Sequence, residues 1–257
     1  MISNRSELAK AQRIVVKVGS SSISGANASK IDVLVDALAA AHARGQQVTL
    51  VTSGAIATGL PLLGIDAKPD DLATAQALAS VGQSRLIARY QSSLERYDIV
   101  AGQVLLTAGD LEAAETSDNA RNAMERLLEL RVIPIVNEND TVATAEIRFG
   151  DNDRLAALVA ELIHADALIL LSDVDALYTM PPTEPGAKRI ELVLAGQEPN
   201  AQIGGTGSKV GTGGALTKVS AAKHAGEAGI PVLLTSLDLV EDALSGENVG
   251  TWFEAKG

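Results

Sequence analysis

The sequence contains no cysteine, and this absence excludes disulfide bonds, thiolate metal sites and a cysteine nucleophile. Aromatic residues make up only 2% of the chain, so the core must be built from Ala, Val, Leu and Ile. The same scarcity argues against the base-stacking platforms that bind single-stranded nucleic acid. The three histidines, His42, His164 and His224, are scattered over predicted helices, so neither a histidine metal cluster nor a catalytic triad is indicated.

Positive charge and long apolar runs are also scarce. The formal net charge is -11, which leaves no broad basic surface to neutralise a nucleic-acid backbone. An anionic small substrate therefore needs a few lysines that converge locally. No window approaches the ~18 consecutive apolar residues of a membrane span, and residues 1–12 are polar and mixed in charge, unlike a signal peptide. We expect a soluble, cytoplasmic protein that binds neither membranes nor nucleic acid.

The chain does contain a regular alternation of apolar strands and helical patterns, joined by short connections. The predicted strands cover residues 13–18, 47–52, 99–106, 132–136, 167–171, 232–235 and 249–253. Predicted helices follow residue 53 and cover residues 30–44, 70–97 (interrupted near Gly82), 117–131, 150–164 and 215–228. Residues 143–149 are expected to be extended, and residues 179–200 to form a loop-rich excursion with a strand near Ile190. This alternation predicts an α/β fold in one domain, with a mainly parallel sheet covered by helices on both faces.

Polar side chains follow four of these strands, at the point where each strand ends. The clusters are Lys17 with Gly19 and Ser20, Thr52 with Ser53 and Gly54, Asn137 to Asp140, and Ser172 with Asp173. In an open parallel sheet, ligands bind at the carboxyl ends of the strands. The sequence therefore predicts a binding site at this edge.

Two lysines are the best candidates for an anion site. Lys17 ends a buried strand and precedes a small-residue turn, which favours anion binding, although a lysine at a strand end can also simply reach solvent. A glycine-rich loop at 204–214 feeds a predicted helix and places Thr217 and Lys218 in its first turn, where free N–H groups favour phosphate oxygens. The loop matches neither the P-loop nor the dinucleotide fingerprint, and a flexible linker is its plain alternative. We expect Lys17 and Lys218 to converge on one phosphoryl group.

Carboxylate and amide groups complete the predicted site. Residues 151–153 hold more polar groups than a helix cap needs, and an aspartate among lysines would keep their ammonium groups positioned and charged. Residues 137–140 suit the α-amino group of an amino-acid ligand, although a polar turn after a buried strand has the same composition. Ser53 lies at a strand-to-helix turn without a base partner nearby in the sequence, so we expect a ligand contact and not a nucleophile.

These groups suit phosphoryl transfer from a nucleotide to an anionic acceptor, a reaction that relies on positioning and on cancellation of charge. A carboxylate acceptor has a reference pKa near ~4.3 for a glutamate side chain and is already ionised at neutral pH. No general base is then required, in keeping with the lack of a histidine candidate. Magnesium is expected to enter on the nucleotide phosphates, with no dedicated protein ligands.

Six stretches in family order resemble the amino-acid kinase superfamily, and within it the enzymes that phosphorylate the γ-carboxylate of glutamate. The stretches are Val15 to Ser20, Val51 to Ile56, Asn137 to Ile147, Gly150 to Asp153, Ser172 to Tyr178 and Gly211 to Lys218. Asn-Glu-Asn-Asp followed by Gly-Asp-Asn-Asp is the specific part, whereas the Val-Lys-Val-Gly strand is shared by the whole superfamily.

The resemblance implies a three-layer αβα sandwich that forms γ-glutamyl phosphate from L-glutamate and ATP, the first step of proline synthesis. An N-terminal lobe of about residues 1–165 would bind glutamate, and a C-terminal lobe of about residues 166–257 would bind ATP. Ser53, Asp140 and Asn152 would bind glutamate, while Lys17 and Lys218 would stabilise the transferring phosphoryl group and Asp153 would organise them. The nucleotide would contact Lys17, Ser172, Asp173, Thr212, Gly213, Gly214, Ala215, Leu216, Thr217 and Lys218. Family members are commonly oligomeric, so a homo-oligomer is implied.

The sequence departs from the family pattern in two places. Ala176 stands where many members have glycine, and Thr179 to Pro182 stands where many have Asp-Pro, which affects the expected adenine contacts. Many members also carry a C-terminal PUA-type domain, which we expect to be absent because the chain stops at Gly257. The alternatives are a superfamily kinase for acetylglutamate, aspartate or a nucleoside monophosphate such as UMP, or a non-catalytic nucleotide or amino-acid sensor. The Asn-Glu-Asn-Asp stretch argues against another superfamily kinase, and the presence of both lysines argues against a non-catalytic sensor.

Overall fold

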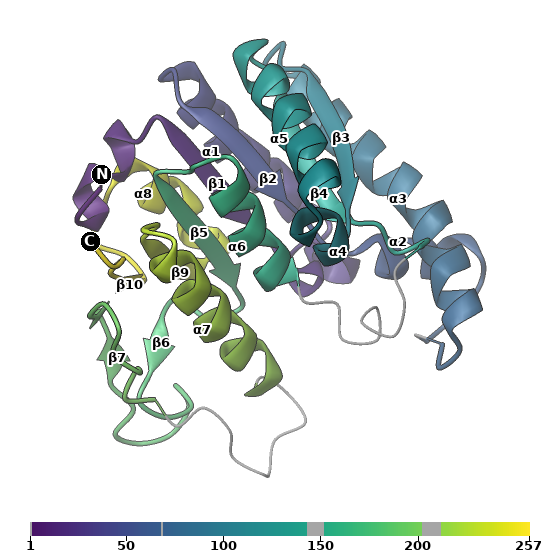
Figure 1. Cartoon of the computed structure of the whole chain (residues 1–257). Helices are drawn as coiled ribbons and strands as arrows, with labels where there is room; N and C mark the ends of the chain where they lie inside the picture. Colours follow the sequence, from purple (N-terminus) through teal and green to yellow (C-terminus); the bar gives the residue numbers. More distant parts are fainter. Residues whose placement is uncertain (1, 68, 143–151, 202–211) are drawn as a thin grey trace.

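The computed structural model describes residues 2–67, 69–142, 152–201 and 212–257, and its centre is an eight-stranded sheet in the order β3-β4-β2-β1-β5-β9-β10-β8 (Figure 1). The strands are β1 (Arg13–Lys17), β2 (Gln47–Val51), β3 (Ala101–Leu106), β4 (Ile133–Glu138), β5 (Ala167–Ser172), β8 (Leu192–Val193), β9 (Val232–Ser236) and β10 (Thr251–Phe253). Adjacent strands are parallel except for the antiparallel β9–β10 pair. This confirms the predicted α/β fold with a mainly parallel sheet.

Helices cover both faces of the sheet (Figure 1). They are α1 (Lys30–Ala43), α2 (Ala55–Leu62), α3 (Leu72–Glu95), α4 (Ala108–Glu112), α5 (Ala114–Glu129), α6 (Asn152–Leu162), α7 (Thr212–Glu227) and α8 (Val240–Ser245). Short 3-10 turns lie at Arg5–Lys10, Ser20–Ser22, Gly25–Asn27 and Leu237–Leu239. β6 (Leu177–Tyr178) and β7 (Arg189–Ile190) form a separate antiparallel pair.

Both faces of the central strands are buried, as their continuous apolar sequences predict. In β1, Ile14 and Val16 join a core cluster with α1, α3 and α8, whereas Val15 joins a second cluster with α5, α6 and α7. Successive side chains of a strand point to opposite faces, so a strand between two helical layers has to be apolar at every position. In β1 the two charged residues stand at the ends: Arg13 begins the strand, and Lys17 is buried at the carboxyl end, where the helical layers open to ligands.

The long helix α3 runs without a break through Gly82, so the predicted interruption there is wrong. Gly82 faces α2, and a Cβ at this position would lie 1.8 Å from the carbonyl oxygen of Ala55 and 2.6 Å from the backbone nitrogen of Gly59. The glycine therefore allows two helix backbones to touch. This contact anchors the start of α2, which follows the predicted ligand-binding turn at residues 52–54.

The other predicted elements differ from the structure mainly at their ends. α5 begins at Ala114, earlier than the predicted caps at residues 117 and 118, and α7 begins at Thr212, three residues before its predicted start. The predicted extended segment at 143–149 and most of the glycine-rich loop at 204–214 lie outside the described residues. In the described ranges, no helix is both long and apolar enough to cross a membrane.

Candidate active site

The sheet order brings the predicted polar clusters together. Strands β4, β2, β1, β5 and β9 are consecutive neighbours, so the cluster after β1 lies between those after β2 and β4 on one side and that after β5 on the other. In the sheet, β2 lies on one side of β1 and β5 lies on the other, so the strand order reverses its direction at β1. This reversal of direction is where open parallel sheets place their ligands.

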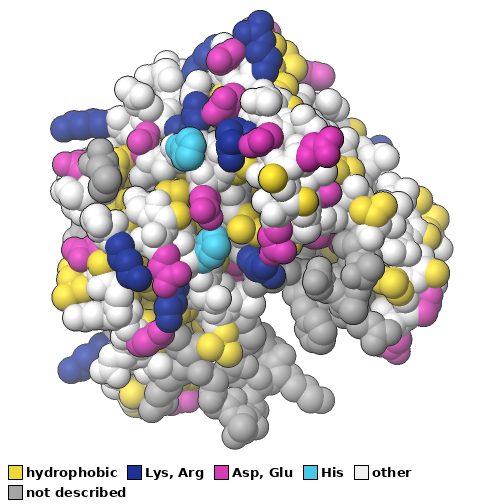
Figure 2. Space-filling view, in the orientation of Figure 1, with side chains coloured by type: hydrophobic (Ala, Val, Ile, Leu, Met, Phe, Trp, Pro, Cys, Tyr) yellow, Lys and Arg dark blue, Asp and Glu magenta, His cyan; other side chains and the backbone are white. Residues whose placement is uncertain are grey.

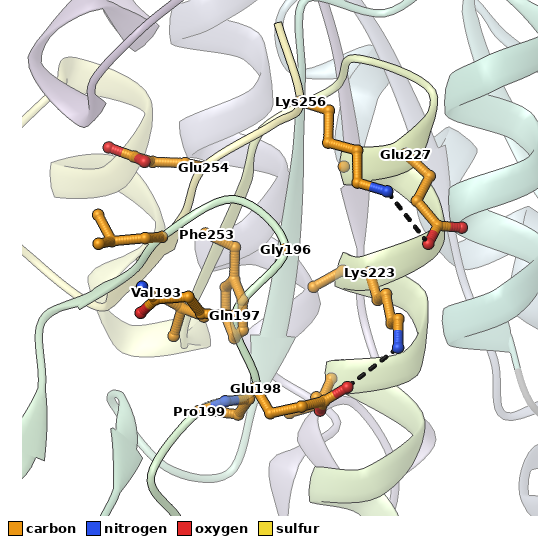
Figure 3. A pocket seen from close by; sticks show the side chains of 14 residues that line it. Val193, Gly196, Gln197, Glu198, Pro199, Lys223, Glu227, Phe253, Glu254 and Lys256 are labelled. Carbon is orange, nitrogen blue, oxygen red and sulfur yellow. Dashed lines mark hydrogen bonds and ion pairs between the residues drawn. The ribbon is translucent and has the colours of Figure 1, made fainter.

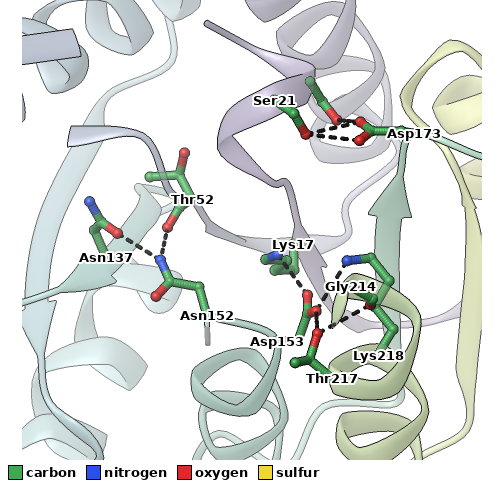
Figure 4. Close-up of polar contacts among 11 residues, drawn as sticks. Lys17, Ser21, Thr52, Asn137, Asn152, Asp153, Asp173, Gly214, Thr217 and Lys218 are labelled. Carbon is green, nitrogen blue, oxygen red and sulfur yellow. Dashed lines mark hydrogen bonds and ion pairs between the residues drawn. The ribbon is translucent and has the colours of Figure 1, made fainter. Parts of the chain in front are cut away.

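Lys17, Asp153 and Lys218 meet at this point, although 200 residues separate the two lysines (Figure 4). The ammonium nitrogen of Lys17 lies 2.6 Å from Oδ1 of Asp153, and that of Lys218 lies 3.1 Å from Oδ2. All three residues are buried, with exposed fractions of 5%, 3% and 9% in chain order. One carboxylate thus holds two ammonium groups side by side, as the sequence predicted.

Burial and the two lysines act in opposite directions on the pKa of Asp153. Desolvation favours the neutral acid and raises the pKa, while the charges of Lys17 and Lys218, with hydrogen bonds from Lys17 and Thr217, lower it. The lysines prevail, so the pKa of Asp153 lies below its ordinary value and the carboxylate is ionised at neutral pH. The cluster then carries one negative and two positive charges, and its surplus positive charge suits an incoming phosphoryl group.

Helix α7 supplies Lys218 from its second turn, not from the first turn as predicted, because the helix starts earlier. Thr217 beside it donates a hydrogen bond from Oγ1 to Asp153 Oδ2 at 2.8 Å and also lies 3.2 Å from the Gly214 carbonyl oxygen. The residues predicted to bind nucleotide from Thr212 to Leu216 form the start of the helix, where N–H groups lack helical partners. Ala215 is half-buried there, and Leu216 is exposed.

Ser172 and Asp173 reach the site from β5, next to β1 in the sheet. The Asp173 carboxylate accepts hydrogen bonds from Ser21 Oγ, at 3.0 and 3.1 Å, and from Ser22 Oγ at 3.1 Å. It therefore fixes the turn that follows Lys17, a contact that the sequence did not reveal. On the other side of this turn, Gly54 lies so close to Ser20 that a Cβ would meet the serine Cβ at 3.4 Å.

The residues predicted to bind glutamate lie on the β2 and β4 side of Lys17. Ser53 is half-buried in the turn between β2 and α2, directly before Gly54, whose φ of +103° is in the left-handed region that favours glycine. Asn152 is the first residue of α6 and immediately precedes Asp153, so one helix start contributes to both halves of the site. Asp140 follows β4 and lines a cavity of about 160 Å³ between this strand end and α3.

Three buried side chains join this half of the site, of which the sequence had singled out only the Asn137 stretch. Asn137 Oδ1 accepts a hydrogen bond from Asn152, and Asn137 Nδ2 donates to Gln83 of α3. Tyr90, also on α3, bonds through its hydroxyl to Thr52 Oγ1 at 2.8 Å. In the sequence, the feature that could have indicated Gln83 and Tyr90 is the presence of two polar groups on the apolar face of an alanine-rich helix.

Among the residues that the structure describes, Lys17, Asp153 and Lys218 are the only charged ones that are buried. A second cavity, of about 120 Å³, lies between β8, α7 and β10, and none of the predicted site residues line it (Figure 3). Two ion pairs line this cavity, Lys223 with Glu198 and Lys256 with Glu227. On the face drawn in Figure 2, basic and acidic side chains are interspersed.

Comparison with known proteins agrees with this geometry. The model of the amino acid kinase family matches residues 12–236. Glutamate 5-kinase of Clavibacter michiganensis subsp. michiganensis is 68% identical over 255 residues, covering 99% of this chain and 98% of that protein. Glutamate 5-kinase of Leifsonia xyli subsp. xyli is 66% identical over 254 residues, covering 98% and 94%. Among solved structures, carbamate kinase from Giardia lamblia bound to AMP-PNP superposes with a TM-score of 0.66 at 13% identity, covering 96% of this chain and 100% of that one, a likeness of fold.

Proposed function

The chain belongs to the amino acid kinase family, and from that premise we propose that it transfers the terminal phosphoryl group of ATP to the γ-carboxylate of L-glutamate. The product is γ-glutamyl 5-phosphate, so the reaction is that of a glutamate 5-kinase, the first step of proline biosynthesis. The identity of 66–68% with glutamate 5-kinases over nearly the full chain supports the choice of acceptor. The observation that carries the mechanism is the pair of buried lysines held on one carboxylate.

Lys17 and Lys218 act on the group that moves. The negative charge of the transferring phosphoryl group is spread over its equatorial oxygens, and fixed cations placed beforehand stabilise it without reorganisation during the reaction. Asp153 keeps both ammonium groups in place and charged at distances of 2.6 and 3.1 Å. The glutamate carboxylate is already ionised at neutral pH, so the attacking oxygen needs no general base.

The two substrates approach Lys17 from opposite sides. Glutamate binds on the β2 and β4 side, where Ser53, Asp140 and Asn152 are placed, and ATP binds on the β5 and α7 side, with Ser172, Asp173 and residues 212–218. The sheet order supports this division, because β1 separates the two groups of strands. Residues up to about 165 thus serve glutamate and later residues serve ATP, with Lys17 and Asp153 shared.

Magnesium enters bound to the nucleotide phosphates, as this small hard cation usually does in kinases, and adds its positive charge to that of the lysines. Asp153 is engaged by two ammonium groups, so it suits lysine positioning better than metal binding. Assembly into a homo-oligomer stays a prediction, which light scattering on the purified protein would check.

ATP turnover against a panel of acceptors tests the proposal. Hydroxylamine in the assay traps an acyl phosphate as a hydroxamate, and the panel contains glutamate, acetylglutamate, aspartate and UMP. We expect hydroxamate with glutamate and little turnover with the others. Turnover confined to another acceptor would reassign the substrate, and no turnover with any acceptor would favour a sensor.

A further inference from the structure

Five buried residues around the predicted glutamate site are joined by a chain of hydrogen bonds that starts and ends on helix α3. Gln83 Oε1 accepts from Asn137 Nδ2 at 2.7 Å, and Asn137 Oδ1 accepts from Asn152 Nδ2 at 2.8 Å. Asn152 Nδ2 also donates to the Thr52 carbonyl oxygen at 2.5 Å, and Thr52 Oγ1 bonds the Tyr90 hydroxyl. The five exposed fractions run from 0% to 8%. Gln83 and Tyr90 are seven residues apart, two turns of one helix, and so lie on the same face.

Two backbone groups fix the orientation of every amide in this network. The Thr52 carbonyl oxygen can only accept, so the Asn152 atom that faces it must be Nδ2. The Glu138 N–H can only donate, at 2.9 Å, so the Asn137 atom that faces it must be Oδ1. Asn137 therefore presents Nδ2 to Gln83, and Gln83 must answer with Oε1. No amide in the series can be flipped without pairing two like groups.

This orientation determines what Asn152 can offer a substrate. Both hydrogens of its Nδ2 are used, by Thr52 and Asn137, and its Oδ1 has no hydrogen-bond partner among the residues that the structure describes. An amide oxygen accepts hydrogen bonds, so it suits an ammonium group and repels a carboxylate. Asp140 and Gln83 line the same cavity, so negative charge lies beside the hydrogen-bonded network.

We propose that Gln83 is a positioning residue for substrate recognition: through Asn137 it orients Asn152 so that Oδ1 faces the α-ammonium group of the amino-acid substrate. The inference rests on the proposed function, since it assumes a substrate that carries an ammonium group. In this role Gln83 acts through Asn137. Its acceptor oxygen holds Asn137, and loss of that oxygen leaves a buried Asn137 N–H unpaired and removes one of the three hydrogen bonds that hold this amide.

The test is Gln83→Met, which keeps the length of the side chain and removes the acceptor, with Gln91→Met on the exposed face of the same helix as matched control. Two constants are measured: KM for glutamate, and the inhibition constant of glutarate, which has both carboxylates but no ammonium group. We expect KM for glutamate to rise about tenfold, in line with loss of a hydrogen bond to a charged group. The glutarate constant and KM for ATP should change less than about twofold, and Gln91→Met should change none of them. Gln83→Glu retains the acceptor and should retain the preference for glutamate over glutarate.

The outcomes separate this inference from the proposed function. If both glutamate and glutarate bind more weakly by the same factor, Gln83 is only structural and the inference is overturned. If Gln83→Met does not fold, a folded Gln83→Glu that has lost the preference for glutamate overturns it as well. If the wild-type protein forms no hydroxamate with glutamate, the proposed function fails first and this inference falls with it.

Discussion

Replacing Asp153 with asparagine should destabilise the protein strongly, because the carboxylate is the counter-charge of two buried ammonium groups. Asp153→Asn keeps the size of the side chain and removes only its negative charge. The side chains of Lys17, Asp153 and Lys218 are 7%, 4% and 11% exposed, so solvent screens the remaining charges little. Removing one partner of a buried ion pair costs about 3–5 kcal/mol, since an uncompensated charge stays behind. Thermal unfolding of a chain of this size shifts by about 2–4 °C per kcal/mol, so the midpoint should fall by about 6–20 °C.

The matched control is Asp238→Asn, which makes the same chemical change in an exposed pair. Asp238 lies 2.8 Å from the ammonium group of Lys30, and their side chains are 65% and 36% exposed. Such surface pairs contribute less than about 1 kcal/mol, so the melting temperature should move by no more than a few degrees. Calorimetry or circular dichroism measures both variants. An Asp153→Asn melting temperature as close to wild type as that of the control would refute the claim that the carboxylate neutralises the two lysines.

The stability difference between wild type and Asp153→Asn should change with pH in a definite direction. The pKa of Asp153 is lower in the folded protein than in the unfolded chain, so the unfolded chain binds more protons in that range. The stabilisation is complete above the ordinary aspartate pKa of about 3.9 and is lost as the pH falls through the lower, folded value. Asparagine does not titrate. Urea unfolding should therefore show the gap between wild type and Asp153→Asn narrowing below about pH 4, and a gap that widens there would contradict the lowered pKa.

Three further changes test other parts of the site. Lys218→Ala should lower kcat at least 100-fold and raise KM for glutamate only slightly, since the lysine acts on the transferring group; steady-state kinetics showing an effect on KM alone would make it a binding group. Gly82→Ala should cost about 3 kcal/mol in urea unfolding, because its Cβ would lie 1.8 Å from the Ala55 carbonyl oxygen, whereas Gly109→Ala, whose nearest neighbour is at 3.7 Å, should be neutral. Asp173→Ala should raise KM for ATP several-fold and leave KM for glutamate unchanged, by releasing the turn after Lys17; equal effects on both substrates would contradict the division of the site.

The sequence was sufficient to predict the fold and the central cluster because both leave local patterns. Continuous apolar strands alternate with helices, which predicts a buried parallel sheet, and polar groups collect where the strands end. Lys17 stood out as a cation at the end of an apolar strand, and Lys218 as a cation after a glycine-rich loop. Their meeting on Asp153 depends on the order of the strands in the sheet, which local sequence patterns do not specify.

The residues that support the site were harder to find, since their roles depend on tertiary contacts. Gln83 reads as one polar residue in an alanine-rich helix, and its partner Asn137 is 54 residues away. Glycine disfavours helices, so Gly82 predicts a break in the helix, yet in the structure it allows α2 to touch α3. In each case the contact that explains the residue is made with another helix or strand, so the spacing of residues along its own helix does not predict its role.

The central claim is that a carboxylate oxygen of glutamate attacks the phosphorus atom of ATP between the two lysines. Glutamate labelled with ¹⁸O in its γ-carboxylate tests it directly, with hydroxylamine present to attack the acyl carbon of the product and release phosphate. The oxygen that bridged carbon and phosphorus leaves with that phosphate, so ³¹P NMR should show one ¹⁸O atom in each phosphate formed. Unlabelled phosphate would mean that water, not glutamate, accepts the phosphoryl group, and would contradict the account.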